Sequence, residues 1–236
     1  MVDDDNQNRG RLLPAAYDLA RRLGANPSRK QSTVRLRQTG RMRQVGALRW
    51  MAFRAQQMIS NVNCAFDWRA RTGPFGLVTV RDALTEDGGQ ADARALGFIP
   101  VVRAKGSSPL TRGELMRYLA ELALAPQAIL FNTGLRWRED GPDRLVVGAG
   151  SGETAAEVIL SLDSDGRIAG AFAPDRPRSV QPPFLPTPWQ GRFSGYRQQN
   201  GMWLPFSAEV GWVIDGKEDI CWEGRMEHWE TVEDGR

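Results

Sequence analysis

A chain of 236 residues with 41% hydrophobic and 25% charged side chains has the composition of a globular protein and is long enough to form a substantial core. No apolar run approaches the roughly 20 residues of a transmembrane helix, and the acidic Asp3-Asp4-Asp5 stands where a signal peptide would be basic. With Cys64 and Cys221 as the two cysteines, a disulfide framework is not expected, and the sequence predicts a cytoplasmic location without a membrane span.

The net charge of +3 conceals an uneven distribution along the chain. Basic residues outnumber acidic ones in residues 1–117, the opposite holds in residues 118–236, and ten basic residues but no acid lie between Asp18 and Asp67. The basic part either attracts an anionic partner or forms strands that pair with the acidic part. The second interpretation is favoured because charged residues mostly cover solvated faces.

The amino-terminal part of the chain predicts one short helix followed by strands. Leu12 to Leu23 has an amphipathic pattern, with Pro14 in the first turn and Gly24 after the end. From Thr33 to Arg43 polar and apolar residues alternate, which is typical of a half-buried strand. Further strands are expected over residues 50–59, 66–71, 75–84, 90–96 and 98–104.

The segment from Thr111 to Phe131 predicts the central helix. Thr111 and Glu114 have the spacing of a capping box, and a leucine stripe follows at helical spacing over residues 115–122. Pro126 disfavours a helical conformation at the residue before it, so the helix should stop or kink there.

Beyond Pro126 the turn dipeptides Asp-Gly and Asn-Gly recur at short intervals, which is typical of β-hairpins. Strands are expected over residues 135–139, 145–148, 155–162, 167–173, 191–198, 202–214 and 219–229, and the proline-rich residues 174–188 should form a surface loop. We therefore predict one α+β domain over residues 1–236. A long curved antiparallel sheet, a half-barrel, wraps the helix at 111–125, a short amino-terminal helix lies at an edge or end, and residues 1–10 are flexible.

The usual catalytic and metal-binding patterns are weak in this sequence. The single His228 cannot build a two-histidine metal site, and its position in a strand indicates the margin of the packed face. The glycine-rich stretch at 148–152 is followed by Glu153, which would place a carboxylate where a dinucleotide pyrophosphate should bind. The sequence therefore predicts no metal and no cofactor.

A ligand pocket is the remaining candidate for a site. If the sheet surrounds the central helix, an Arg117–Glu121 pair one turn apart becomes the polar end of a cavity whose walls come from the tryptophan-rich strands. The ordinary alternative is an exposed ion pair worth a few tenths of a kcal/mol. The residues predicted to bind a ligand are Arg117, Tyr118, Glu121, Trp189, Trp212 and Trp222.

Several separated motifs together resemble one uncharacterised bacterial family, a domain of unknown function. They include Gln38-x-Gly40, Trp50-x-x-Phe53, Phe66-x-Trp68, Arg117-Tyr118-Leu119-x-Glu121 followed by Pro126-x-Ala128-x-Leu130, and Trp222-x-Gly224. The resemblance covers nearly the whole chain and implies no known reaction. The order of strands and helices is also similar to that of periplasmic lipoprotein carriers such as LolA, which implies a bent sheet around a lipid-binding cavity.

Three hypotheses of function follow. The first is a non-enzymatic binding module for a small, apolar or amphiphilic ligand, motivated by abundant tryptophan and few catalytic residue types. The second is an enzyme that uses Glu121 as a general base and Arg117 as an electrostatic clamp. The third is an adaptor for an acidic partner, bound through the Arg35–Arg43 face. A nucleic-acid partner is not expected, because no aromatic residues interleave these arginines.

Overall fold

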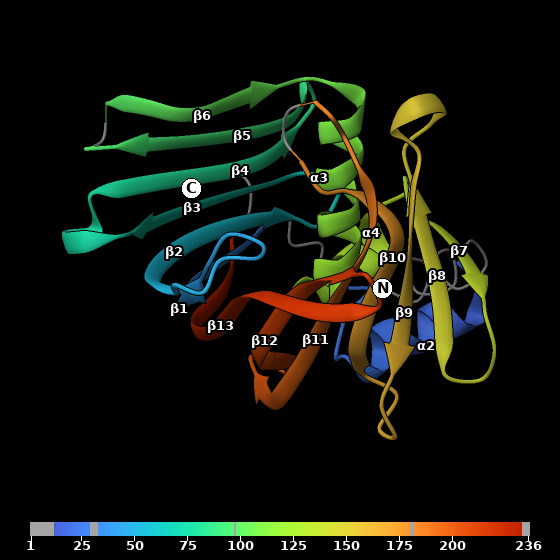
Figure 1. Cartoon of the computed structure of the whole chain (residues 1–236). Helices are drawn as coiled ribbons and strands as arrows, with labels where there is room; N and C mark the ends of the chain where they lie inside the picture. The colour runs from blue at the N-terminus through green and yellow to red at the C-terminus, as the bar shows by residue number, and fades with distance from the viewer. Residues whose placement is uncertain (1–11, 29–32, 97, 180–181, 233–236) are drawn as a thin grey trace.

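The computed structural model describes residues 12–28, 33–96, 98–179 and 182–232. The amino-terminal segment predicted to be flexible, residues 1–10, lies outside them. Within the described part, thirteen antiparallel strands form one continuous sheet in the order β6-β5-β4-β3-β2-β1-β13-β12-β11-β10-β9-β8-β7. The sheet is strongly curved into a half-barrel (Figure 1). The first half consists of β1 (Thr33–Met42), β2 (Met51–Ser60), β3 (Phe66–Thr72), β4 (Val78–Thr85), β5 (Gly88–Ala95) and β6 (Ile99–Lys105).

The second half is formed by the strands that follow the central helices. They are β7 (Arg136–Glu139), β8 (Arg144–Ala149), β9 (Ala156–Leu162), β10 (Ile168–Pro177), β11 (Pro186–Gln199), β12 (Met202–Ile214) and β13 (Lys217–Val232). The two halves join where β1 pairs with β13, so that Val34 lies opposite Thr231. Three 3-10 segments complete the chain: η1 (Pro74–Gly76), η2 (Glu121–Leu124) and η3 (Gly152–Thr154).

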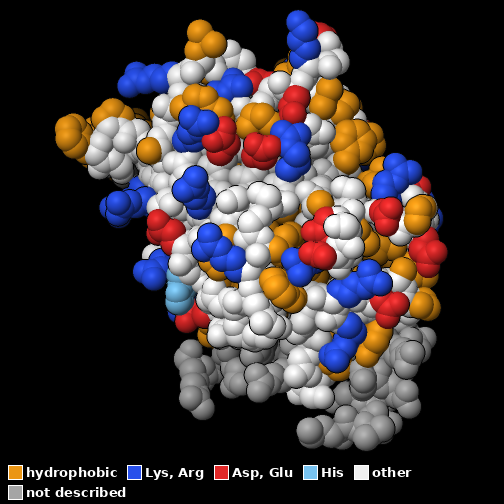
Figure 2. Space-filling model, turned by 90° about the horizontal axis from the view of Figure 1, so that it is seen from below, with side chains coloured by type: hydrophobic (Ala, Val, Ile, Leu, Met, Phe, Trp, Pro, Cys, Tyr) orange, Lys and Arg blue, Asp and Glu red, His pale blue; other side chains and the backbone are white. Residues whose placement is uncertain are grey.

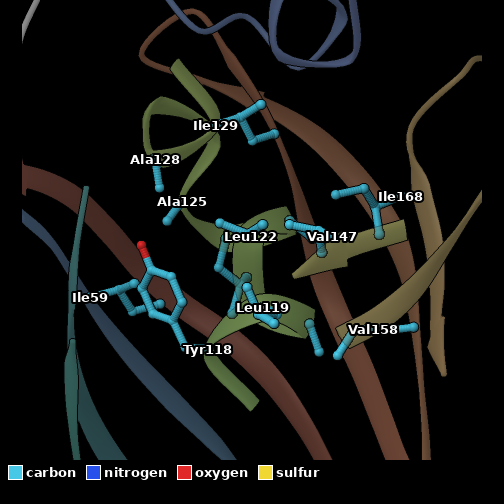
Figure 3. Packing of buried hydrophobic residues seen from close by; sticks show 14 of the residues in the cluster. Ile59, Tyr118, Leu119, Leu122, Ala125, Ala128, Ile129, Val147, Val158 and Ile168 are labelled. Atoms are coloured by element: carbon cyan, nitrogen blue, oxygen red, sulfur yellow. The ribbon is translucent and has the colours of Figure 1, made fainter. Parts of the chain in front are cut away.

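Three α-helices accompany the sheet: α2 (Pro14–Arg22), α3 (Ser108–Ala120) and α4 (Pro126–Phe131). Helix α3 contacts β4 and β5 of the first half and β8, β9 and β10 of the second, whereas α2 packs on α4. Side chains of α3 and η2 fill the space between the halves: Tyr118 faces Ile59 of β2, and Leu119 and Leu122 face strands of the second half (Figure 3). These side chains are fully buried, which makes the helical segment the centre of the hydrophobic core.

The central helix begins earlier than its sequence indicates. Ser107 is the N-cap, and its hydroxyl accepts a hydrogen bond from the Leu110 amide at 3.4 Å. The predicted capping box is wrong because Thr111 lies inside the helix, where its hydroxyl accepts from the Gly89 amide of β5 at 2.9 Å. The predicted interruption before Pro126 is confirmed: Ala125 is non-helical, with φ −132° and ψ 62°, and Pro126 starts α4.

Two further predictions need correction. The proline-rich loop is shorter than expected, because β10 continues to Pro177 and β11 begins at Pro186. His228 is not at the margin of the packed face: a register shift between β1 and β13 places Trp229 in the core, and the His228 side chain is 40% exposed.

The uneven charge distribution is resolved by the pairing of β1 with β13. On the exposed face Arg35 lies 3.4 Å from Glu230, and Arg41 bonds Glu223 at 2.7 and 2.9 Å. Arg43, whose side chain is 15% exposed, pairs with Asp219. The ordinary interpretation is thus confirmed for this strand, since the basic β1 lies against the acidic β13.

Candidate functional site

A cavity of about 240 Å³ lies between the concave face of the sheet and the segment formed by α3 and η2. Its walls come from β1, β3 and β4 of the first half and from β10 to β13 of the second. The space therefore suits a small molecule or one segment of a larger one.

Six aromatic side chains line the cavity, and they are Trp68, Trp189, Phe193, Phe206, Trp212 and Trp222. Trp68 is fixed by a hydrogen bond from its indole nitrogen to Gln38 Oε1 at 3.0 Å. Phe53 packs behind the wall, edge-on to Trp68 at 5.8 Å and stacked on Trp222 at 5.4 Å between ring centroids. These contacts leave the rings little rotational freedom and make the cavity largely preformed.

Two glycines allow this packing. A Cβ at Gly40 would overlap the backbone of Glu223, so glycine permits the close approach of β1 to β13. The Trp222 ring lies directly on Gly224, where an added Cβ would overlap it. The motifs Gln38-x-Gly40 and Trp222-x-Gly224 therefore need glycine because a side chain at either position would overlap a neighbouring group.

A charged cluster borders one side of the cavity: Asp82, Arg117, Glu121 and Arg176 line it, and Glu114 lies beside Arg176. Arg117 donates from Nε to Glu121 Oε1 at 2.9 Å and from Nη1 to Asp82 Oδ2 at 3.0 Å. Gln57 of β2 donates to the other oxygen of Glu121. Arg176 lies on the opposite strand β10, with its guanidinium 4.5 Å from the Trp189 ring centroid.

Burial changes the ionisation of this cluster. Desolvation raises the pKa of Asp82 and of Glu114, to about 7 for Glu114, where the negative charge of Asp82 adds to the effect. Desolvation also lowers the pKa of Arg176. Burial alone would lower the pKa of Arg117, but the carboxylates of Glu121, Asp82 and Glu114 raise it above its usual range. Arg117 is therefore the fixed positive centre of the cluster.

Five of the six residues predicted to bind a ligand line the cavity: Arg117, Glu121, Trp189, Trp212 and Trp222. Tyr118 points elsewhere. Its hydroxyl donates to Ser60 O at 3.0 Å and accepts from Asn132 Nδ2 at 2.9 Å, and burial raises its pKa. Tyr118 therefore connects the helix to the β2–β3 turn and does not contribute to the cavity wall.

The sequence interpretation missed three members of the charged cluster. Asp82 and Arg176 lie on strands whose partners were not known, and Glu114 was assigned to a helix cap. One signal was available in the sequence. A buried arginine has five N–H donors, and Glu121 alone cannot accept all of them, so Arg117 needs a second acceptor from another element. The pair is not on a solvated face, since the side chains of Arg117 and Glu121 are 15% and 16% exposed.

The spacing of Asp163 and Asp165 resembles the start of a calcium-binding loop, but the structure shows a turn. Asp163 accepts hydrogen bonds from the amides of Asp165 and Arg167, which is the geometry of a hairpin turn. Among the residues that the structure describes, no group of three or more His, Cys, Asp or Glu could hold a metal ion. No helix in the same part of the chain is long and apolar enough to cross a membrane.

The protein is therefore an antiparallel half-barrel with a cavity beside its central helix. The chain belongs to the Family of unknown function DUF6544, whose sequence model matches residues 14–224. None of the curated proteins matches it.

Three solved structures share the fold. A LolA superfamily protein from Nitrosomonas europaea superposes with a TM-score of 0.51 at 10% identity, covering 94% of each chain. A Vibrio parahaemolyticus domain described as an outer membrane lipoprotein-sorting protein gives 0.54 at 11% identity, covering 94% of this chain and 93% of the other. A DUF1329 family protein from Desulfovibrio piger gives 0.52 at 12% identity, covering 95% of both chains. At these identities the similarity shows the fold.

The predicted cytoplasmic location is corrected by these structures. A LolA superfamily protein and an outer membrane lipoprotein-sorting domain share this fold, and this finding overturns the cytoplasmic prediction. The prediction relied on the low cysteine number and on the acidic Asp3-Asp4-Asp5 in place of a basic signal segment. Cys64 and Cys221 are both free, and a fold with a large buried core does not need a disulfide in either compartment.

Proposed function

We propose that this protein is a non-enzymatic binding module for a small, partly apolar ligand. The half-barrel wraps α3 so that the ligand lies in the 240 Å³ cavity against Trp189, Trp212 and Trp222, with Arg117 and Glu121 at its polar side. The observation that carries the proposal is this preformed aromatic cavity with polar groups on one side, which is the usual composition of a ligand site. A periplasmic location belongs to the same proposal and is tested by cell fractionation.

The two other hypotheses have less support. Both carboxylate oxygens of Glu121 already accept hydrogen bonds, from Arg117 and Gln57, so a general base would first have to lose one of them. On the Arg35–Arg43 face, Arg35, Arg41 and Arg43 are each paired with an acid of β13. Their charges are therefore largely compensated within the chain.

Native mass spectrometry of the freshly purified protein tests the proposal directly, and a co-purifying small molecule is the expected result. Titration with the neutral fluorescent probe N-phenyl-1-naphthylamine provides a second measurement. Ala120→Phe fills the cavity from α3 and should abolish probe binding, whereas Ala52→Phe, on the exposed face of β2, should preserve it. Absence of a co-purifying molecule, together with probe binding that Ala120→Phe leaves unchanged, would refute the proposal.

A further inference from the structure

Arg176 is the cation of the charged cluster in which neither terminal nitrogen makes a hydrogen bond to a described residue. Its side chain is 13% exposed, and Nε donates to Gly113 O at 3.1 Å. Nη2 lies 3.9 Å from Glu114 Oε1, which is beyond hydrogen-bond distance. Within the described part of the chain, no acceptor lies within hydrogen-bond distance of its two terminal nitrogens.

The other acids of the cluster do not compensate for this. Asp82 and Glu121 bond to Arg117, which leaves the loosely placed Glu114 as the nearest carboxylate of Arg176. The guanidinium of Arg176 lies 4.5 and 5.6 Å from the ring centroids of Trp189 and Trp212 and forms part of the cavity wall. A largely buried guanidinium whose terminal donors are unused is suited to bind an anionic acceptor, because hydrogen bonds between charged partners are the strongest.

From this geometry we propose that the ligand is a small amphiphilic acid. Its carboxylate accepts hydrogen bonds from the terminal nitrogens of Arg176, and its apolar part lies against Trp189, Trp212 and Trp222. Two parallel N–H donors match the two oxygens of a carboxylate, and the aromatic walls bind a short alkyl or aryl chain. This inference rests on the proposed ligand-binding function and specifies the chemical class of the ligand.

Glu114 makes binding depend on pH. The charged groups around it are Asp82 on β4, Arg176 on β10, and Arg117 and Glu121 on the central helical segment. Its Oε2 atom is buried without a hydrogen bond, and burial raises its pKa to about 7. A ligand carboxylate at Arg176 adds negative charge beside Glu114 and favours its protonated form. Binding therefore takes up a proton above this pKa, and the affinity falls as the pH rises through about 7.

The experiment compares octanoate with octan-1-ol, which have the same chain length, by isothermal titration calorimetry. We expect wild-type protein at about pH 6 to bind octanoate at least about 10-fold more tightly. Arg176→Met should bind the two equally, while Glu114→Gln should bind octanoate with an affinity that no longer falls above pH 7. Thermal unfolding of each variant shows whether it folds. If a variant does not fold, the comparison of octanoate with octan-1-ol in wild-type protein still tests whether the ligand is anionic.

Equal affinity of wild-type protein for octanoate and octan-1-ol would overturn the assignment of an anionic ligand while leaving the apolar-ligand function intact. Binding of neither compound, together with failure of the neutral fluorescent probe, would overturn both. Preference for octanoate that survives in a folded Arg176→Met variant would overturn the role of Arg176.

An independent observation concerns the far end of the first half of the sheet. The turn between β3 and β4 and the turn between β5 and β6 are joined by a hydrogen bond from Leu96 N to Leu77 O at 2.7 Å. We call this region the wing tip. It exposes five of the ten large apolar side chains that are exposed in the described chain, namely Phe75 at 99%, Leu77 at 46%, Leu96 at 51%, Phe98 at 73% and Ile99 at 46%. Such a concentration exceeds what isolated surface residues produce.

Arginines surround the wing tip. The exposed face of β1 to β5 contains an open hollow of about 1420 Å³ lined by Arg37, Arg54, Arg69, Arg71, Arg81 and Arg94. Asp67 pairs with Arg69 and Arg81, and Asp92 pairs with Arg94. Arg37, Arg54 and Arg71 form no ion pair with any described residue, and residues 71–78 and 94–101 contain no acid. In Figure 2 blue and orange side chains project along the left margin, the side on which Figure 1 shows these turns.

We further infer that the wing tip and this arginine face bind an anionic lipid surface. Aromatic and aliphatic side chains on two adjacent turns can enter the interface of a bilayer, and the unpaired arginines behind them attract anionic headgroups. A soluble acidic protein or a nucleic acid would match the arginines alone, and neither explains the apolar tip.

Co-sedimentation tests this with vesicles of phosphatidylglycerol and phosphatidylcholine in equal parts and with vesicles of phosphatidylcholine alone. Binding is expected to the anionic vesicles and to fall about 10-fold or more in Phe75→Ser/Phe98→Ser and in Arg54→Gln/Arg71→Gln. The control Leu48→Ser/Leu185→Ser removes exposed apolar side chains that lie neither at the wing tip nor on a strand of the arginine face, and it should bind as wild type does. Absent binding, equal binding to both vesicles, or binding of a single-stranded oligonucleotide but not of vesicles would overturn the inference.

Discussion

Replacement of Glu114 by glutamine should change the pH dependence of stability in a defined direction. The side chain is 7% exposed, and its pKa rises from the ordinary 4.5 to about 7 in the folded protein. Below pH 4.5 the carboxyl is mostly protonated in both the folded and the unfolded chain, so it does not lower the free energy of unfolding. As the pH rises from 4.5 to 7, the unfolded chain loses the proton while the folded protein keeps it, so the folded state loses stability across this window. At 1.36 kcal/mol for each pH unit, the loss reaches about 3 kcal/mol.

Urea unfolding of wild type and Glu114→Gln at about pH 4.5, 6 and 8 measures this loss. The variant should match wild type at the lowest pH and exceed its free energy of unfolding by up to about 3 kcal/mol at the highest, because glutamine stays neutral. Glu86→Gln, at an exposed glutamate, is the matched control and should follow wild type throughout. A difference between Glu114→Gln and wild type that is the same at every pH would refute the reasoning.

Three further variants test the site and its support. Tyr118→Phe removes the hydroxyl bonded to Ser60 and Asn132 and should lower the free energy of unfolding by about 1–3 kcal/mol, with probe affinity unchanged; a loss of probe affinity at equal stability would place Tyr118 in the site. Arg117→Met leaves Asp82 and Glu121 without their cation and should cost about 3–5 kcal/mol in urea unfolding; a cost below 1 kcal/mol would mean that the pair is solvated. Gly224→Ala should push the Trp222 ring into the cavity and weaken N-phenyl-1-naphthylamine binding in fluorescence titrations, and unchanged affinity would exclude that ring from the site.

The succession of strands along the chain was predictable because local signals bound most of them, whereas the pairing of β1 with β13 was not predicted. Alternation in residues 33–43 and the Asn-Gly and Asp-Gly turns reflect short-range chemistry, and β1 and β12 lie where these signals place them. The start of α3 was misplaced because Thr111 has the local pattern of a cap, while its actual partner, the Gly89 amide, is remote in sequence. A pattern of neighbouring residues cannot predict a hydrogen bond between residues that are far apart in the sequence.

The candidate site was partly predictable for the same reason. Arg117 and Glu121 are four residues apart on one helix, so their pairing follows from helix geometry. Arg176 reaches the cluster through the pairing of β10 with β11 and the contact of β10 with α3, and no periodicity in the sequence encodes that neighbourhood. The separation of Tyr118 from the cavity depends on the rotation of α3 about its axis, which is set by packing against Ile59 and the second half of the sheet (Figure 3).

The position of β13 has a consequence for how the chain is made. This strand is the middle one of the thirteen but the last of them to be synthesised, so its two neighbours, β1 and β12, keep open hydrogen-bonding edges until β13 has been made. The contact between Val34 and Thr231 joins the first strand to the last, and such long-range pairing forms slowly. Nascent chains lacking the final strand should therefore be the species most prone to aggregation and most dependent on chaperones.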